Sequence, residues 1–159
     1  MKNNNKSRRQ RGFTLIEILL VMGIIAILAA VVIVAINPAR QFAQARNSQR
    51  TSNVFSILNA ISQNMSDNGG VFTCPAGAIP TTATAIKSSG GYDGASCLTP
   101  TYLPTIPFDP SATGAHFISN TDYDTAYTVV KDATTGRITV AAPEALTAGE
   151  LNKTISATR

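Results

Sequence analysis

The residues with the clearest chemical potential lie near the start of the chain, where one acidic side chain stands inside an apolar segment. Glu17 is the only charged residue between Phe13 and Ile36, and Arg8, Arg9 and Arg11 stand immediately before that segment. A carboxylate in lipid costs roughly 2.5–3.5 kcal/mol on insertion scales. We therefore expect Glu17 either to find a cationic partner or to lie at the membrane interface as an incidental charge.

Two cysteines, Cys74 and Cys97, are the next candidates for chemistry, and both lie in the polar part of the chain. Lysine and arginine beside a membrane span stay cytoplasmic, so the polar part is expected to face outward. An oxidising compartment favours a Cys74–Cys97 disulfide. Its loop of about 24 residues would stabilise the fold by roughly 3 kcal/mol. Two separate buried thiols are the alternative.

Residues that could support catalysis or bind a metal are few. His116 is the only histidine, and no G-x-S-x-G, P-loop or H-E-x-x-H motif occurs. We therefore predict no enzymatic activity, no catalytic residue and no required cofactor. Asp109, Asp122 and Asp124 could supply oxygen ligands to calcium. Their spacing is not that of an EF-hand, and solvated turn residues are the other interpretation.

The net charge of +4 does not indicate nucleic-acid binding. Five of the 13 basic residues precede Phe13, which leaves eight against nine acidic residues in the rest of the chain. The body of the protein is thus nearly neutral, without the excess of cations that phosphate contacts require.

A long helix near the N-terminus is expected to position the candidate residues described above. A helix over Phe13–Ile36 would be about 36 Å long and could cross a hydrocarbon core of roughly 30 Å. Because good helix formers follow Pro38, we predict a kinked or locally loosened continuous helix there. Beyond it, Val54, Leu58, Ile61 and Met65 form an apolar stripe. Polar residues from Arg46 to Gln63, including Asn47 and Arg50, are assigned to the other faces.

The rest of the sequence, from residue 71 onward, predicts a small sheet. Residues 71–113 are rich in proline and glycine and form a loop-rich middle. Residues 126–141 predict a hairpin whose turn is Asp132–Gly136, a short strand is expected near residues 116–118, and residues 144–159 are expected to be irregular. A sheet this small needs a packing partner, and the apolar stripe can serve. The fold class is therefore α+β, with one long N-terminal helix packed on an antiparallel sheet.

The segment "RGFTLIE" followed by an unbroken apolar stretch resembles the N-terminal signature of the type IV pilin and type II secretion pseudopilin superfamily. The resemblance implies a pilin-like fold, cleavage by prepilin peptidase after Gly12 and N-methylation of Phe13. It also implies that Glu17 of one subunit meets the Phe13 amine of a neighbour in a filament. The stretch "YLPTIPFDP", followed by a tyrosine-containing strand, is similar to the region of major pseudopilins in which a loop before the last strands binds calcium.

From these observations we expect four parts: a basic leader (1–12), a transmembrane and filament-core helix half (13–37), an amphipathic half (38–68) and an extracytoplasmic β domain (69–159). The expected function is that of a structural subunit of a type IV pilus, anchored in the cytoplasmic membrane with its N-terminus inside and later part of an extracellular or periplasmic filament. The partners implied are further copies of the chain, prepilin peptidase, the platform protein, the assembly ATPase and membrane lipid.

Several alternatives remain open. The chain could be a type II secretion pseudopilin, or a membrane-anchored extracytoplasmic binding module that works as a monomer. The apolar segment could also be an ordinary secretory signal peptide or a plain signal anchor. It is about twice the length usual for a signal peptide, and it carries a charge at its start.

Overall fold

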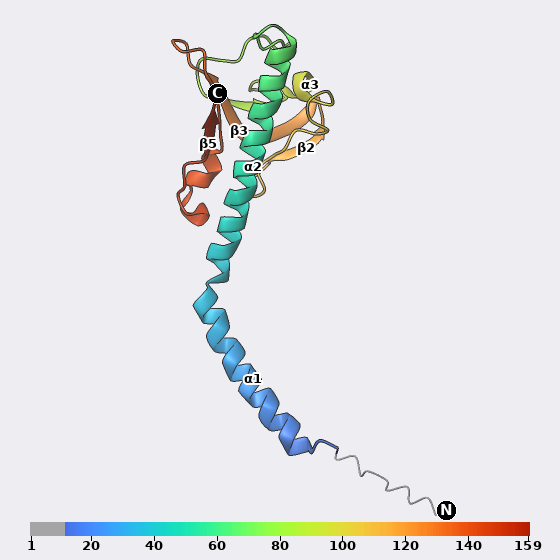
Figure 1. Cartoon of the computed structure of the whole chain (residues 1–159), viewed down its shortest axis with the longest axis vertical. Helices are drawn as coiled ribbons and strands as arrows, with labels where there is room; N and C mark the ends of the chain where they lie inside the picture. Colours follow the sequence, from blue (N-terminus) through green and yellow to red (C-terminus); the bar gives the residue numbers. More distant parts are fainter. Residues whose placement is uncertain (1–11) are drawn as a thin grey trace, which may run out of the picture. The chain divides into compact units, whose positions relative to one another are not determined.

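The computed structural model describes residues 12–159, which belong to two compact units divided after Pro38 (Figure 1). The predicted leader, apart from Gly12, lies outside the described residues. The first unit contains helix α1 (Leu15–Ile36), and none of its residues is buried. Ala39–Arg159 form the second unit, which contains the sheet and the hydrophobic core.

The prediction of a continuous helix through Pro38 is wrong. Helix α1 ends at Ile36, Asn37 has left-handed backbone angles (φ 47°, ψ 79°), and helix α2 (Pro38–Asp67) begins at the next residue. Asparagine tolerates this conformation better than most residues. Proline at a first helical position loses nothing, because its missing N–H would have had no intrahelical partner. The local sequence Asn37-Pro38 thus ends one helix and starts another.

Helix α2 supplies the predicted apolar stripe to the core. Val54, Leu58 and Ile61 are buried together with Ile57, and Met65 packs against them while partly exposed. The helix ends where Asn68-Gly69-Gly70 predicts. Both glycines have positive φ, and the Gly70 N–H donates to the Met65 carbonyl at 2.7 Å. This closure satisfies one of the carbonyls that a helix end leaves without a partner.

The sheet has five antiparallel strands. The predicted hairpin is confirmed: in it Val129 pairs with Val140 and Lys131 with Ile138. The expected short strand is β2, which pairs with β3. The strand order in the sheet is β1-β3-β4-β5. Strand β2 is not part of this order, because it pairs with β3 alongside the other neighbours of that strand. The strands are β1 (Thr84–Lys87), β2 (His116–Ser119), β3 (Asp122–Lys131), β4 (Ile138–Ala141) and β5 (Ser156–Thr158).

Two regions are more ordered than the sequence predicted. The loop-rich middle contains β1 and the short helix α3 (Ala95–Leu98). The C-terminal residues, expected to be irregular, form the 3-10 helices η1 (Pro143–Leu146) and η2 (Ala148–Glu150) and the edge strand β5. These elements have three or four residues each, too few for periodicity to identify them.

The expected disulfide between Cys74 and Cys97 is present, with Cα atoms 5.4 Å apart. It links the segment that follows α2 to α3. Leu98 beside it is buried in the core. The α+β class, with a long helical N-terminal part and a small antiparallel sheet, is therefore confirmed.

Candidate processing and assembly segment

The N-terminal end of α1 begins with a capping box made by Thr14 and Glu17. The Glu17 N–H donates to Thr14 Oγ1 at 3.3 Å, and the Thr14 N–H donates to Glu17 Oε2 at 3.4 Å. Each contact satisfies a backbone donor that the first helical turn leaves without a partner. The Glu17 carboxylate is therefore held at the positive end of the helix dipole, close to the chain that precedes the helix.

The peptide bond between Gly12 and Phe13 lies just outside this helix. Gly12, Phe13 and Thr14 are not helical, and all three are exposed. A Cβ built on Gly12 would meet no atom within 4 Å. Because the bond is neither helical nor covered, a protease can reach it within this unit. The fold itself gives no steric reason for a glycine at position 12.

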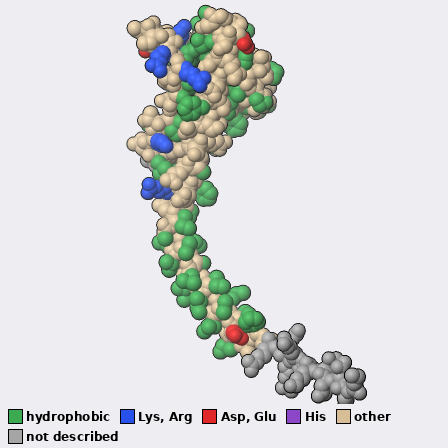
Figure 2. Space-filling model, in the orientation of Figure 1, with side chains coloured by type: hydrophobic (Ala, Val, Ile, Leu, Met, Phe, Trp, Pro, Cys, Tyr) green, Lys and Arg blue, Asp and Glu red, His purple; other side chains and the backbone are tan. Residues whose placement is uncertain are grey.

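Beyond the capping box, α1 presents apolar side chains on every face. Phe13 is 79% exposed and Leu15 82%, and the exposed apolar residues continue to Ile36. Figure 2 shows hydrophobic side chains along this helix. With a mean hydropathy of 3.3, α1 is long and apolar enough to cross a membrane. Such a surface is stable only in lipid or against other apolar helices.

The second unit contains a buried ionic cluster, which the sequence did not predict. Arg50, assigned to a solvent-facing side of α2, is fully buried and donates to Asp109 Oδ2 at 2.7 Å and to Glu150 Oε2 at 2.8 Å. Asn47, also assigned outward, is buried and donates to the Glu150 carbonyl. Burial alone would lower the pKa of Arg50, and its two carboxylate partners outweigh that effect and raise it.

The pKa values of the two carboxyl partners, Asp109 and Glu150, shift in the opposite direction from that of Arg50. Burial tends to raise the pKa of Asp109, but the Arg50 guanidinium and the N–H groups of Ser111 and Ala112 lower it below its ordinary value. Burial has the same tendency at Glu150, where the hydrogen bonds from Arg50 and Arg46 lower the pKa. Both carboxylates are therefore charged at neutral pH. The cluster joins α2 to the loop around residue 109 and to η2.

The candidate calcium ligands are not brought together. Asp109 is held by Arg50, Asp122 contacts His116 at 3.1 Å, and Asp124 accepts the Ala126 N–H at 2.9 Å. In the part of the chain that the structure describes, no three acidic, histidine or cysteine side chains could hold a metal ion. The described structure therefore does not bring these three carboxylates together, and Asp109 is already held in an internal ion pair.

Comparison with known proteins gives one finding. Residues 7–33 match the family model of the prokaryotic N-terminal methylation motif. No curated protein and no solved structure matches the chain. The match includes the expected cleavage position, Phe13, Glu17 and most of α1. The N-terminal region of this chain therefore carries the methylation signal of type IV pilin- and pseudopilin-like prepilins.

Proposed function

We propose that the chain is a filament subunit that is cleaved after Gly12, N-methylated at Phe13 and assembled into a type IV pilus. The observation that carries this proposal is the methylation motif on a helix that is apolar on every face and has no buried residue. The helix α1 serves first as a membrane anchor and then as part of a filament core. Membrane lipid, prepilin peptidase, the platform protein and the assembly ATPase are the partners that the motif implies.

Hydrolysis of the bond between Gly12 and Phe13 leaves a carboxylate on the leader and a new amine on Phe13. That amine is a cation which the uncleaved chain lacks at this position. In apolar surroundings an unpaired carboxylate and an unpaired amine are both costly, whereas together they attract strongly. We propose that Glu17 pairs with the Phe13 amine of a neighbouring subunit, so that apolar packing drives assembly while the ion pair sets the register.

Processing is tested on the N-terminus of the mature protein. We expect mass spectrometry of sheared extracellular material to find a chain that begins with N-methyl-phenylalanine at Phe13. Gly12→Val should retain residues 1–12, because the added side chain obstructs the peptidase while the open space around Gly12 leaves α1 unaffected. Gly149→Ala, another substitution into open space, is the control. An intact leader on wild-type filaments would contradict the proposal.

The assembly role is tested with Glu17→Val and Glu17→Gln. Glutamine can still accept the Thr14 N–H, so it preserves the capping box and removes only the charge. We expect both variants to insert and be cleaved, but to give about tenfold less filament, since lost charge pairing commonly costs more than 1.4 kcal/mol in apolar surroundings. Filament mass in the sheared fraction, compared with total subunit, is the measurement. Wild-type yield from Glu17→Gln would refute the pairing.

A pseudopilus subunit is the alternative within the same superfamily. It would be processed in the same way but would remain in the periplasm at native expression. Recovery of filaments from the cell surface by shearing therefore distinguishes the two. A monomeric binding module would give neither filaments nor a methylated Phe13.

A further inference from the structure

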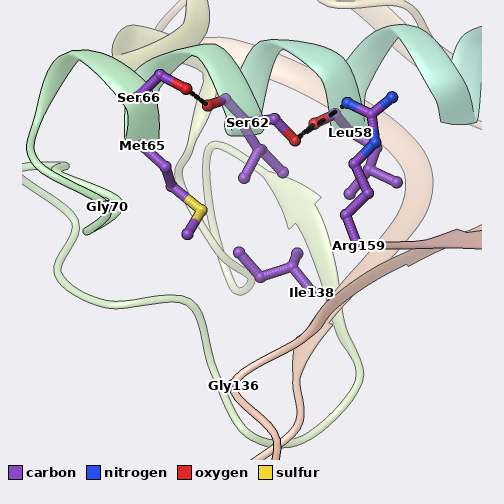
Figure 3. A pocket seen from close by; sticks show the side chains of 9 residues that line it. Leu58, Ser62, Met65, Ser66, Gly70, Gly136, Ile138 and Arg159 are labelled. Carbon is purple, nitrogen blue, oxygen red and sulfur yellow. Dashed lines mark hydrogen bonds between the residues drawn. The ribbon is translucent and has the colours of Figure 1, made fainter.

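A cavity in the second unit lies between the C-terminal end of α2 and the start of β4. Its volume is about 280 Å³, and we call it the α2–β4 cavity. For comparison, a cavity of about 150 Å³ in another protein admits benzene. Figure 3 shows Met65 and Ile138 facing each other across it. Leu58 and Ile61 complete the apolar lining, so the cavity suits an aliphatic side chain.

One charged group stands at the edge of this cavity. Arg159 contributes to the lining, and its side chain donates to Ser62 Oγ at 3.5 Å (Figure 3). A guanidinium has five N–H donors. Within residues 12–159, this long hydrogen bond is the only one that the Arg159 side chain makes. The cavity therefore fits a partner that presents an aliphatic side chain next to a carboxylate.

The chain itself has one such pair. Eight of its nine acidic side chains accept a hydrogen bond or join an ion pair within the described residues, and Glu144 makes neither. Leu146, in the same 3-10 helix, is 50% exposed. Ala145 between them is fully buried. Ala145 is thus covered, whereas Glu144 is partly exposed and Leu146 exposed on either side of it.

The contacts that η2, the helix after η1, makes with α2 lie at a different level of α2 from the cavity. The segment that follows η1 is fixed to α2 at Asn47 and Arg50 through Glu150. The cavity uses Leu58 to Ser66 of the same helix, so the two levels differ by about 20 Å along the helix axis. A Glu144–Leu146 pair therefore cannot fill the cavity of its own chain while η2 remains fixed. It can fill the cavity of another copy.

We propose that η1 of one subunit docks into the α2–β4 cavity of the next, with Leu146 inside the cavity and Glu144 paired with Arg159. The proposal rests on the proposed function as a filament subunit and names a contact between its β domains. The contact joins two different surfaces, so it is heterologous and can repeat along an open filament. One such contact buries little surface and is weak alone. Its repetition along the filament raises the overall strength of association.

A charge exchange tests the pairing in full-length chains. Glu144→Arg and Arg159→Glu each place like charges together, and we expect each to lower the mass of sheared filament about tenfold. The double variant should restore at least half of the wild-type yield. Arg159 is exposed and its strand contacts are made by its backbone, so its substitution leaves the fold intact. Lys131→Glu, the same charge change on the exposed end of β3, is the control.

Cysteine pairing tests the geometry separately. Leu146→Cys combined with Met65→Cys should give a ladder of disulfide-linked multimers from wild-type-like filaments on a non-reducing gel, and each single variant should not. A ladder together with charge rescue supports the proposal. Unchanged yield in either single charge variant, no rescue in the double variant, or no ladder from intact filaments overturns it. Filaments that form normally despite such results would leave the proposed function standing, whereas unprocessed monomers would refute that function first.

Discussion

Arg50 shows how a single buried charge can hold three segments of a small domain together. Its guanidinium contacts Asp109 and Glu150, and it also donates to Ser111 Oγ and to Asn47 Oδ1. Every buried side-chain nitrogen and oxygen in the described residues has a hydrogen-bond partner. Removing one member of such a cluster leaves another charge buried and uncompensated, so the cost greatly exceeds that of an exposed pair.

We expect Arg50→Ala to lower the free energy of unfolding by about 3–5 kcal/mol, because Asp109 would remain buried without its cation. Arg46→Ala is the matched control. It removes the partly exposed partner of the same Glu150, and should cost about 0–1 kcal/mol. Chemical denaturation of the detergent-solubilised chain, followed by circular dichroism, measures both. Equal effects of the two substitutions would contradict the importance of the buried pair.

The same cluster predicts how stability depends on pH. The pKa values of Asp109 and Glu150 are lower in the folded chain than in the unfolded chain. As the pH falls through about 4, the unfolded state takes up protons first, so acidification favours unfolding. The stabilisation is fully present above the ordinary carboxyl pKa and is lost as the pH falls through the folded values. Asp109→Asn should therefore flatten the unfolding profile below about pH 5. An unchanged slope would contradict this origin.

Among the elements, those with a clear period could be predicted from the sequence. Val54, Leu58 and Ile61 repeat at helical spacing, and Tyr127 and Val129 alternate along a strand, so the helix face and the hairpin were both identified. The strands β1 and β5 have four and three residues, and their identity depends on pairing with β3 and β4. Short segments stabilised by neighbours leave little trace in the local sequence.

The ionic cluster around Arg50 could not be predicted from the sequence, for a different reason. Arg50 lies 59 residues from Asp109 and 100 residues from Glu150 along the chain. Its position in a row of polar residues predicts exposure, because an arginine is seldom fully buried unless it is paired. Only the folded chain brings the two carboxylates to it. By contrast, the methylation motif is local, with Gly12, Phe13 and Glu17 within six positions, and could therefore be identified from sequence alone.

For the molecule as a whole, the division after Pro38 separates two units of different character. The first unit buries none of the α1 residues, whereas the second contains the hydrophobic core and the disulfide. Burial of apolar surface is the main favourable term in folding, and α1 contributes none of it within the chain. The stability of the second unit should therefore not depend on α1.

We expect the fragment Ala39–Arg159 to fold alone, to stay soluble and to keep the Cys74–Cys97 disulfide. Its thermal midpoint should lie within about 3 °C of that of the full chain in mild detergent, because a change of 1 kcal/mol shifts a domain of this size by a few degrees. Calorimetry and a non-reducing gel measure the two properties. A fragment that is unfolded or aggregates would show that α1 contributes to the fold.

The strands at the edges of the sheet are short, and this limits aggregation through edge-to-edge pairing of strands from different copies. Strands β1 and β5 end the strand order and β2 pairs with β3 alone, so the borders of the sheet are strands of four, three and four residues. A long open border would offer backbone N–H and C=O groups to any neighbouring strand, and crowding in a membrane or filament would favour such cross-β pairing. Borders this short give an intruding strand few hydrogen bonds. Edge-to-edge cross-β pairing between copies of the chain would therefore be weak.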